Sequence, residues 1–185
     1  IAVTRKLPTT VETQLGEIVD PKFNLNDTPF SESQLIRAVN WADILVPTVT
    51  DQVNAKVINA AGPNLKLIAN FGVGVNHIDL EAAEANGIQV SNTPDVLTED
   101  TADLAMALIM MASRRLGEGE RMIRAGNWTG WTPTQLMGNR VSGRSLGVIG
   151  MGRIGQALAK RARGFGMSIH YHNRKRLNLK IEREL

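Results

Sequence analysis

Short apolar runs alternate along the chain with longer stretches whose apolar residues recur every three or four positions. Runs rich in β-branched residues predict strands, and strands that alternate with helices predict parallel sheets with helical crossovers. The pattern therefore predicts an α/β protein. The predicted strands are IAVT from residue 1, DILVPT from 43, LKLIAN from 65, IQVSN from 88, SLGVIG from 145 and SIHYHN from 168.

Three of the intervening stretches open with the start signal of a crossover helix. SESQLIRAVNWA opens with Ser31, DQVNAKVINAAG with Asp51 and DLEAAEANG with Asp79, and each of these side chains is a candidate N-cap. The last two stretches also close on a glycine, which is the commonest residue after a helix end.

A longer helix is predicted over residues 98–116. Thr98 is its candidate cap, Glu99 and Asp100 lie in the first turn, and Arg114 and Arg115 lie in the last, as the helix dipole favours. Its middle, LAMALIMMA, is apolar on nearly every side, so two domains or a second subunit must cover it. The run is far shorter than the roughly 20 residues that a membrane-spanning helix needs, so no membrane span is predicted.

Two segments repeat the order strand, Gly-rich turn, helix, Gly, strand. The second contains G-x-G-x-x-G at Gly150, Gly152 and Gly155, which give a tight turn, close approach of a pyrophosphate and close packing of helix on strand. It predicts a dinucleotide site. The first has only Gly72 and Gly74, with His77 in the third place, so free N–H groups there suit a smaller anion such as a carboxylate.

The end of the second strand of the dinucleotide unit determines which cofactor fits. An NAD site places Asp or Glu here to bind the ribose hydroxyls, and that carboxylate repels a 2′-phosphate. This chain has Asn173, followed by Arg174, Lys175 and Arg176. The cations offer charge-assisted hydrogen bonds to a phosphate, so NADP (NADPH) is favoured and NAD stays possible. The alternative is that the cations form an ordinary solvated loop.

Composition narrows the choice of partners. Residues 1–113 carry 6 Lys and Arg against 14 Asp and Glu, whereas residues 114–185 carry 15 against 4. The basic part favours anionic ligands, although acids in a continuation of the chain would also balance it. No aromatic residues interleave with the arginines, so nucleic acid is not predicted. The absence of cysteine excludes thiolate metal sites and favours a reducing compartment, the cytoplasm; no metal site is predicted.

The chain resembles the D-isomer-specific 2-hydroxyacid dehydrogenases, and within them the glyoxylate/hydroxypyruvate reductases. The resemblance rests on NFGVGVNHID, NTPDVLTEDTADLAMALIMMASRR, GNWTGWTP and LGVIGMGRIGQALAKRARGFGM followed by HNRKR. It implies a flavodoxin-like substrate-binding domain over residues 1–95 and the first part of an NAD(P)-binding Rossmann domain over residues 96–185. The implied reaction is NADPH-dependent reduction of a small 2-oxo acid, glyoxylate or hydroxypyruvate, to the 2-hydroxy acid.

The resemblance also assigns roles to particular residues. Val73, Gly74 and Val75 fall on the loop that binds the substrate carboxylate, and Thr101 falls near the nicotinamide. The cofactor turn falls on Gly152, Arg153 and Ile154 beside Gly150 and Gly155, and the ribose-phosphate contacts fall on Asn173, Arg174 and Arg176. GNWTGWTP resembles an arm that reaches a partner subunit through Trp131, which implies a homodimer.

The family's catalytic arginine and His-Glu pair have no match before Leu185. His77, His170 and His172 are poor substitutes, because the first belongs to the substrate unit and the others to the adenosine end of the cofactor site. We therefore expect a piece of a longer enzyme, inactive alone. Two alternatives stay open: another D-2-hydroxyacid dehydrogenase, such as one of the phosphoglycerate type, and a non-catalytic dinucleotide-sensing protein of the corepressor kind.

Overall fold

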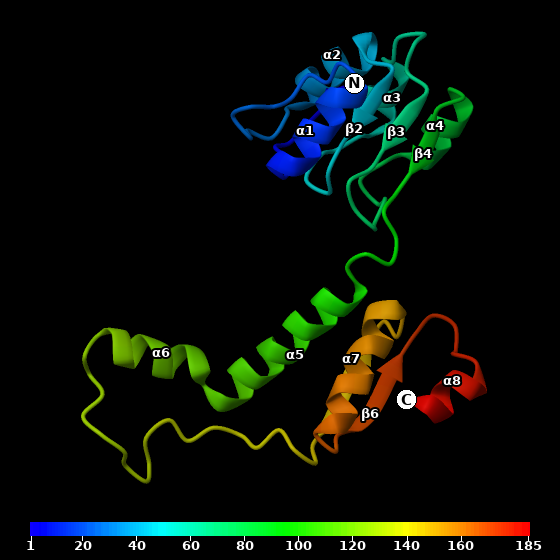
Figure 1. Cartoon of the computed structure of the whole chain (residues 1–185). Coiled ribbons are helices and arrows are strands. Elements are labelled where there is room, and N and C mark those ends of the chain that lie inside the picture. Colours follow the sequence, from blue (N-terminus) through cyan, green and yellow to red (C-terminus); the bar gives the residue numbers. More distant parts are fainter. The chain divides into compact units, whose positions relative to one another are not determined.

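A computed structural model describes all residues, 1–185, and divides the chain into two compact units, Ile1–Pro94 and Asp95–Leu185 (Figure 1). Each unit has a parallel sheet and apolar residues buried against it. None of the helices has the length and apolar character needed to cross a membrane.

The first unit is built on a four-stranded parallel sheet in the order β1-β2-β3-β4. Val3 pairs with Val46, Ile44 with Leu67, and Ile68 with Val90, so consecutive strands are also neighbours in space. The prediction of parallel strands is confirmed. The strands are β1 (Ala2–Val3), β2 (Ile44–Val46), β3 (Leu67–Ala69) and β4 (Gln89–Ser91).

Side-chain caps mark the start of three of the four helices of this unit. Ser31 forms a capping box with Gln34, and Asp79 accepts a hydrogen bond from the N–H of Ala82, as the sequence predicts. The predicted cap at Asp51 is wrong: Asn54 caps the third helix, and Asp51 is buried. The helices are α1 (Thr9–Ile18), α2 (Glu32–Trp41), α3 (Ala55–Asn59) and α4 (Leu80–Ala85).

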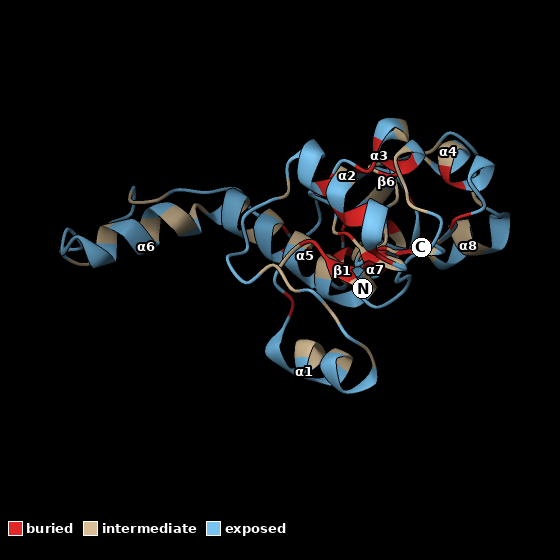
Figure 2. Ribbon diagram, turned by 90° about the horizontal axis from the view of Figure 1, so that it is seen from above, coloured by how far each residue is buried: buried red, intermediate tan, exposed pale blue.

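The core of the first unit lies between the sheet and its helices, and Figure 2 shows buried stretches along β1 and on α2, α3 and α4. Leu45 and Ile68 come from adjacent strands, and Leu35 and Ile58 come from α2 and α3; all four are almost completely buried. Complete burial of such side chains contributes about 1.5 to 3 kcal/mol each. The core therefore holds the ends of the strands, and the loops that follow them, in fixed positions.

The second unit has one pair of parallel strands, β5 (Ser145–Ile149) and β6 (Ser168–His172). Between them runs α7 (Arg153–Gly164), whose Ala157, Ala159 and Ala162 are buried. The remaining helices are α5 (Thr98–Arg114), α6 (Leu116–Arg124) and α8 (Leu179–Glu184). The unit is thus one βαβ motif with further helices.

The long predicted helix differs from α5 at both ends. Thr98 is the first helical residue, and the cap position is Leu97, which makes no side-chain capping bond. Arg115 adopts a left-handed conformation with φ 54°, which ends α5 and starts α6 instead of continuing to residue 116. Within the chain α5 packs on α7, and Leu104 and Leu108 stay 61% and 54% exposed.

Candidate functional site

The turn between β5 and α7 has the backbone that a dinucleotide-binding turn requires. Gly150 has φ 95°, which side chains rarely adopt, and its N–H donates to the carbonyl of His172 at 2.9 Å. A Cβ on Gly155 would lie 2.5 Å from the carbonyl oxygen of Gly150, whereas one on Gly152 would meet nothing within 4 Å. Gly155 thus permits the close helix approach, and Gly152 leaves room for a ligand.

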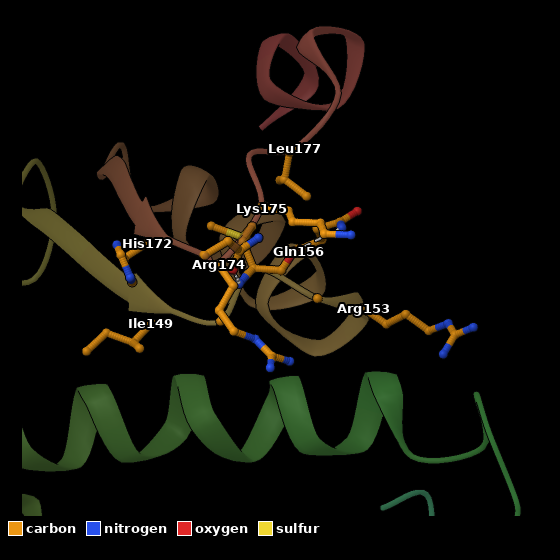
Figure 3. A pocket seen from close by; sticks show the side chains of 11 residues that line it. Ile149, Arg153, Gln156, His172, Arg174, Lys175 and Leu177 are labelled. Atoms are coloured by element: carbon orange, nitrogen blue, oxygen red, sulfur yellow. Dashed lines mark hydrogen bonds between the residues drawn. The ribbon is translucent and has the colours of Figure 1, made fainter.

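A cavity of about 1110 Å³ lies at this turn (Figure 3). It opens at the carboxyl ends of β5 and β6, which is where ligands bind in open α/β sheets. The turn supplies its N–H groups and the start of α7 with Arg153, and the segment after β6 supplies Arg174 and Lys175. The lining residues are Ile149, Gly150, Met151, Gly152, Arg153, Gln156, His172, Asn173, Arg174, Lys175 and Leu177.

Asn173 joins the two sides of the cavity. Its Oδ1 accepts a hydrogen bond from the N–H of Met151 at 2.7 Å, and the carbonyl of Met151 accepts from Nε2 of Gln156 at 3.3 Å. The residue that the sequence places at the ribose position therefore also fixes the Gly-rich turn against the end of β6.

The three cations after Asn173 have different surroundings. Arg174 and Lys175 line the cavity and form no ion pair, and Arg174 extends between Ile149 and Arg153 in Figure 3. Arg176 lies outside this lining and pairs with Glu182 of α8, with Nε to Oε1 at 2.8 Å and Nη2 to Oε2 at 2.7 Å. Hydrogen bonds from Arg176 and from the Tyr171 hydroxyl lower the pKa of Glu182 to about 2. Arg176 is thus already paired with a carboxylate, whereas Arg174 and Lys175 are not.

The other three residues expected at the cofactor, Arg153, Ile154 and Thr101, do not point into the cavity or do not line it. Arg153 points away from the other lining side chains in Figure 3 and pairs with Asp95, Nε to Oδ1 at 2.7 Å. Ile154 is 38% exposed and does not line the cavity. Thr101 is half-buried on α5 and does not line the cavity.

The turn after β3 has the free donors that an anion site needs. The N–H groups of Val73, Gly74 and Val75 donate no hydrogen bond within the chain. Gly74 also lines a cavity of about 310 Å³, together with Val49, Gln52, Asn76 and His77. His77 lies in this turn, three residues before α4 begins at Leu80.

Sequence reasoning missed Asn70, which directly follows β3 and is 2% exposed. Its side chain contacts the carbonyls of the turn and the ring of His77. Burial lowers the pKa of His77, and the carboxylate of Asp51 opposes this shift with a smaller effect. The available signal was a polar residue at the end of an apolar run, where buried amides must find partners.

The family model of the D-isomer specific 2-hydroxyacid dehydrogenase, catalytic domain, matches residues 1–176. That match covers nearly the whole chain and both Gly-rich turns. The chain belongs to this family. The resemblance inferred from the motifs is therefore confirmed, and so is the α/β fold with parallel sheets.

Relatives share both sequence and fold with the chain. A glyoxylate reductase of Korarchaeum cryptofilum is 43% identical over 94% of this chain and 52% of its own length, and a glycerate dehydrogenase of Hyphomicrobium methylovorum is 39% identical over 92% and 53%. The crystal structure of a glyoxylate reductase from Paecilomyes thermophila superposes with a TM-score of 0.79 at 29% identity, covering 98% of this chain and 57% of that one. The chain thus spans about half the length of these relatives.

Proposed function

We propose that this chain is part of an oxidoreductase that reduces a small 2-oxo acid to the 2-hydroxy acid with a nicotinamide dinucleotide, NADPH in preference to NADH. The observation that carries the proposal is that each unit supplies one site: the second unit has a Gly-rich turn that opens a cavity of about 1110 Å³, and the first unit has a turn with free N–H groups. Family membership and the names of the relatives support the same reaction class.

The residues at the larger cavity fit a dinucleotide. Gly152 presents open space beside the first turn of α7, where N–H groups and the helix dipole favour a pyrophosphate. Asn173 stands where a carboxylate would exclude a 2′-phosphate, and Arg174 and Lys175 are free to pair with one. The cofactor, when bound, supplies the hydride that reduces the 2-oxo carbon. In this proposal the N–H groups of Val73, Gly74 and Val75 hold the substrate carboxylate.

Steady-state kinetics on the full-length enzyme test this function. Glyoxylate and hydroxypyruvate should both be reduced, with kcat/KM higher for NADPH than for NADH. The glycerate dehydrogenase of Hyphomicrobium methylovorum makes hydroxypyruvate the second substrate to measure. If neither acid supports oxidation of NADPH, or if only phosphorylated 2-oxo acids do, the proposed substrate class is wrong.

We propose further that residues 1–185 alone do not catalyse the reaction. The family's catalytic arginine and His-Glu pair have no match among these residues, and loss of one such group commonly costs 100-fold or more. The purified 185-residue chain should bind NADPH and show no measurable turnover of glyoxylate. Turnover at roughly 1 s⁻¹, a typical enzymatic rate, would contradict this.

We also propose that the full-length enzyme is a homodimer. The second unit leaves large apolar side chains of α5, α6 and the segment after α6 exposed, and apolar side chains that gather on one surface commonly mark a protein–protein contact. Multi-angle light scattering at micromolar concentration should give twice the chain mass, and a monomer would refute the proposal. The exposed side chains are Leu104, Leu108, Met111, Leu116, Ile123, Trp128, Trp131 and Met137.

A further inference from the structure

Both polar atoms of the Asn70 side chain form hydrogen bonds with the turn that follows it. Its Nδ2 donates to the carbonyl of Gly72 at 3.1 Å and to the carbonyl of Gly74 at 2.9 Å. Its Oδ1 lies 3.0 Å from Nε2 of His77. Because both carbonyls can only accept, the Asn70 amide has one possible orientation, and Nε2 of His77 must be the donor to Oδ1.

The two other carbonyls of the turn are also occupied. The carbonyl of Val73 accepts from Nδ2 of Asn92 at 2.8 Å, and the carbonyl of Val75 accepts from the N–H of Ile78 at 3.0 Å. The carbonyl of Gly72 accepts a second bond, from the N–H of Thr93 at 3.0 Å. Every carbonyl from Gly72 to Val75 is therefore bonded within the chain.

The N–H groups of the same turn, unlike its carbonyls, have no hydrogen-bond partner in the chain. The five consecutive N–H groups of residues 73–77 donate to no acceptor in the chain. Successive free N–H groups form a concave site of partial positive charge that binds anions, and carbonyls turned toward the ligand would cancel that charge. The polarity of the turn thus depends on the groups that hold its carbonyls.

We propose that Asn70 and His77 are positioning residues for the carboxylate of the substrate. Asn70 holds two carbonyls of the turn away from the anion, and His77 holds Asn70 by donating Nε2–H to its amide oxygen. This inference rests on the proposed function, which places the 2-oxo acid at this turn. Burial lowers the pKa of His77, so the ring is neutral near pH 7 with its proton on Nε2.

The test uses the full-length enzyme and two readouts. The first is the affinity for oxalate, an unreactive dicarboxylate, followed through the backbone amide signals of residues 73–77. The second is KM and kcat for glyoxylate at saturating NADPH. The variants are Asn70→Asp, His77→Ala and His77→Gln. Asn64→Ala is the matched control, because Asn64 is an exposed asparagine before β3 whose side chain makes no hydrogen bond.

Asn70→Asp keeps the shape of the side chain, removes its donors and adds a negative charge beside the turn. We expect oxalate binding to weaken tenfold or more and KM for glyoxylate to rise by a similar factor, while kcat stays within about threefold, because ground-state and transition-state binding fall together. His77→Ala should weaken oxalate binding about fivefold and raise KM for glyoxylate by a similar factor. His77→Gln, which can still donate to Asn70, should remain within about twofold of wild type. Asn64→Ala should change nothing.

Several results would overturn the inference. The first is that oxalate leaves the amide signals of residues 73–77 of wild type unshifted. The second is that Asn70→Asp and His77→Ala bind oxalate as tightly as Asn64→Ala does. Equal losses in His77→Ala and His77→Gln would also refute the donor role. If Asn70→Asp does not fold by circular dichroism, the two His77 variants decide. If the oxalate affinities of wild type and the variants follow the expected order but wild type does not reduce glyoxylate, the positioning role stands and the proposed function fails.

Discussion

Arg174→Ala should weaken the use of NADPH by the full-length enzyme about tenfold and leave the use of NADH within about twofold. Arg174 lines the cavity after β6 and forms no ion pair, so its guanidinium is available to a 2′-phosphate. NADH lacks that phosphate. The variant should therefore separate the two cofactors instead of weakening both.

The magnitude follows from the surroundings of the side chain. A hydrogen bond to a charged group contributes about 1.5 to 3 kcal/mol when it is well formed. Arg174 is exposed, and solvent screens its charge, so the lower end of that range applies. About 1.4 kcal/mol corresponds to one factor of ten in affinity. The loss should appear mainly in KM for NADPH.

Arg176→Ala is the matched control, since it removes the same charge two residues away. Arg176 is held by two hydrogen bonds to Glu182 and does not line the cavity. To contact a phosphate it would have to leave that carboxylate. We therefore expect Arg176→Ala to change kcat/KM for NADPH less than threefold.

The assay is kcat/KM for NADPH and NADH with saturating glyoxylate, on wild type and both variants. Equal losses for both cofactors in Arg174→Ala would mean that the arginine only supports the loop. A loss for NADPH that is larger in Arg176→Ala than in Arg174→Ala would show that the Glu182 pair opens on binding. Either result would refute the reasoning from ion-pair geometry.

Three further predictions concern the turn and its surroundings. Asn173→Asp should reverse the cofactor preference in the same assay. It should not lower the unfolding temperature, because a carboxylate oxygen can still accept a hydrogen bond from the Met151 N–H. Asn173→Ala, which removes that acceptor, should lose affinity for both cofactors. Gly155→Ala should lower stability by about 1 to 3 kcal/mol in urea unfolding, because its Cβ would lie 2.5 Å from the Gly150 carbonyl oxygen; Gly164→Ala, on the same helix with open space around it, should not. The pKa of Asp27 is lowered to about 2 by Arg5, so its contribution to stability is present above about pH 4 and is lost as the pH falls toward 2; the unfolding temperature of Asp27→Asn should fall less over that interval than that of wild type.

The sequence was sufficient for the features that depend on local chemistry. Short runs rich in β-branched residues predicted all six strands, and Ser31 and Asp79 were correctly assigned as caps because their side chains act on residues two or three positions away. The glycine spacing predicted a backbone that the coordinates show directly, with a positive φ at Gly150 and a close helix approach at Gly155.

Features that depend on tertiary contacts could not be read in this way. Asp51 looks like a helix cap in sequence, but its Oδ2 accepts from the Thr4 hydroxyl, 47 positions away, and the cap falls to Asn54. The partner of Arg176 is an acid on α8, a helix that the sequence pattern did not indicate. The role of Asn70 can be seen only in the fold, where the turn brings the carbonyls of Gly72 and Gly74 within hydrogen-bonding distance of its side chain.

The hydrogen bond from Met151 to Asn173 has a consequence for how cofactor preference can change over time. Asparagine and aspartate, which have neighbouring codons, both offer an oxygen to that N–H, so the anchor of the Gly-rich turn survives either residue. If residue 173 sets the cofactor as proposed above, selection on the cofactor and selection on folding act separately at this position. A lineage could exchange one dinucleotide for the other here without passing through an unstable intermediate.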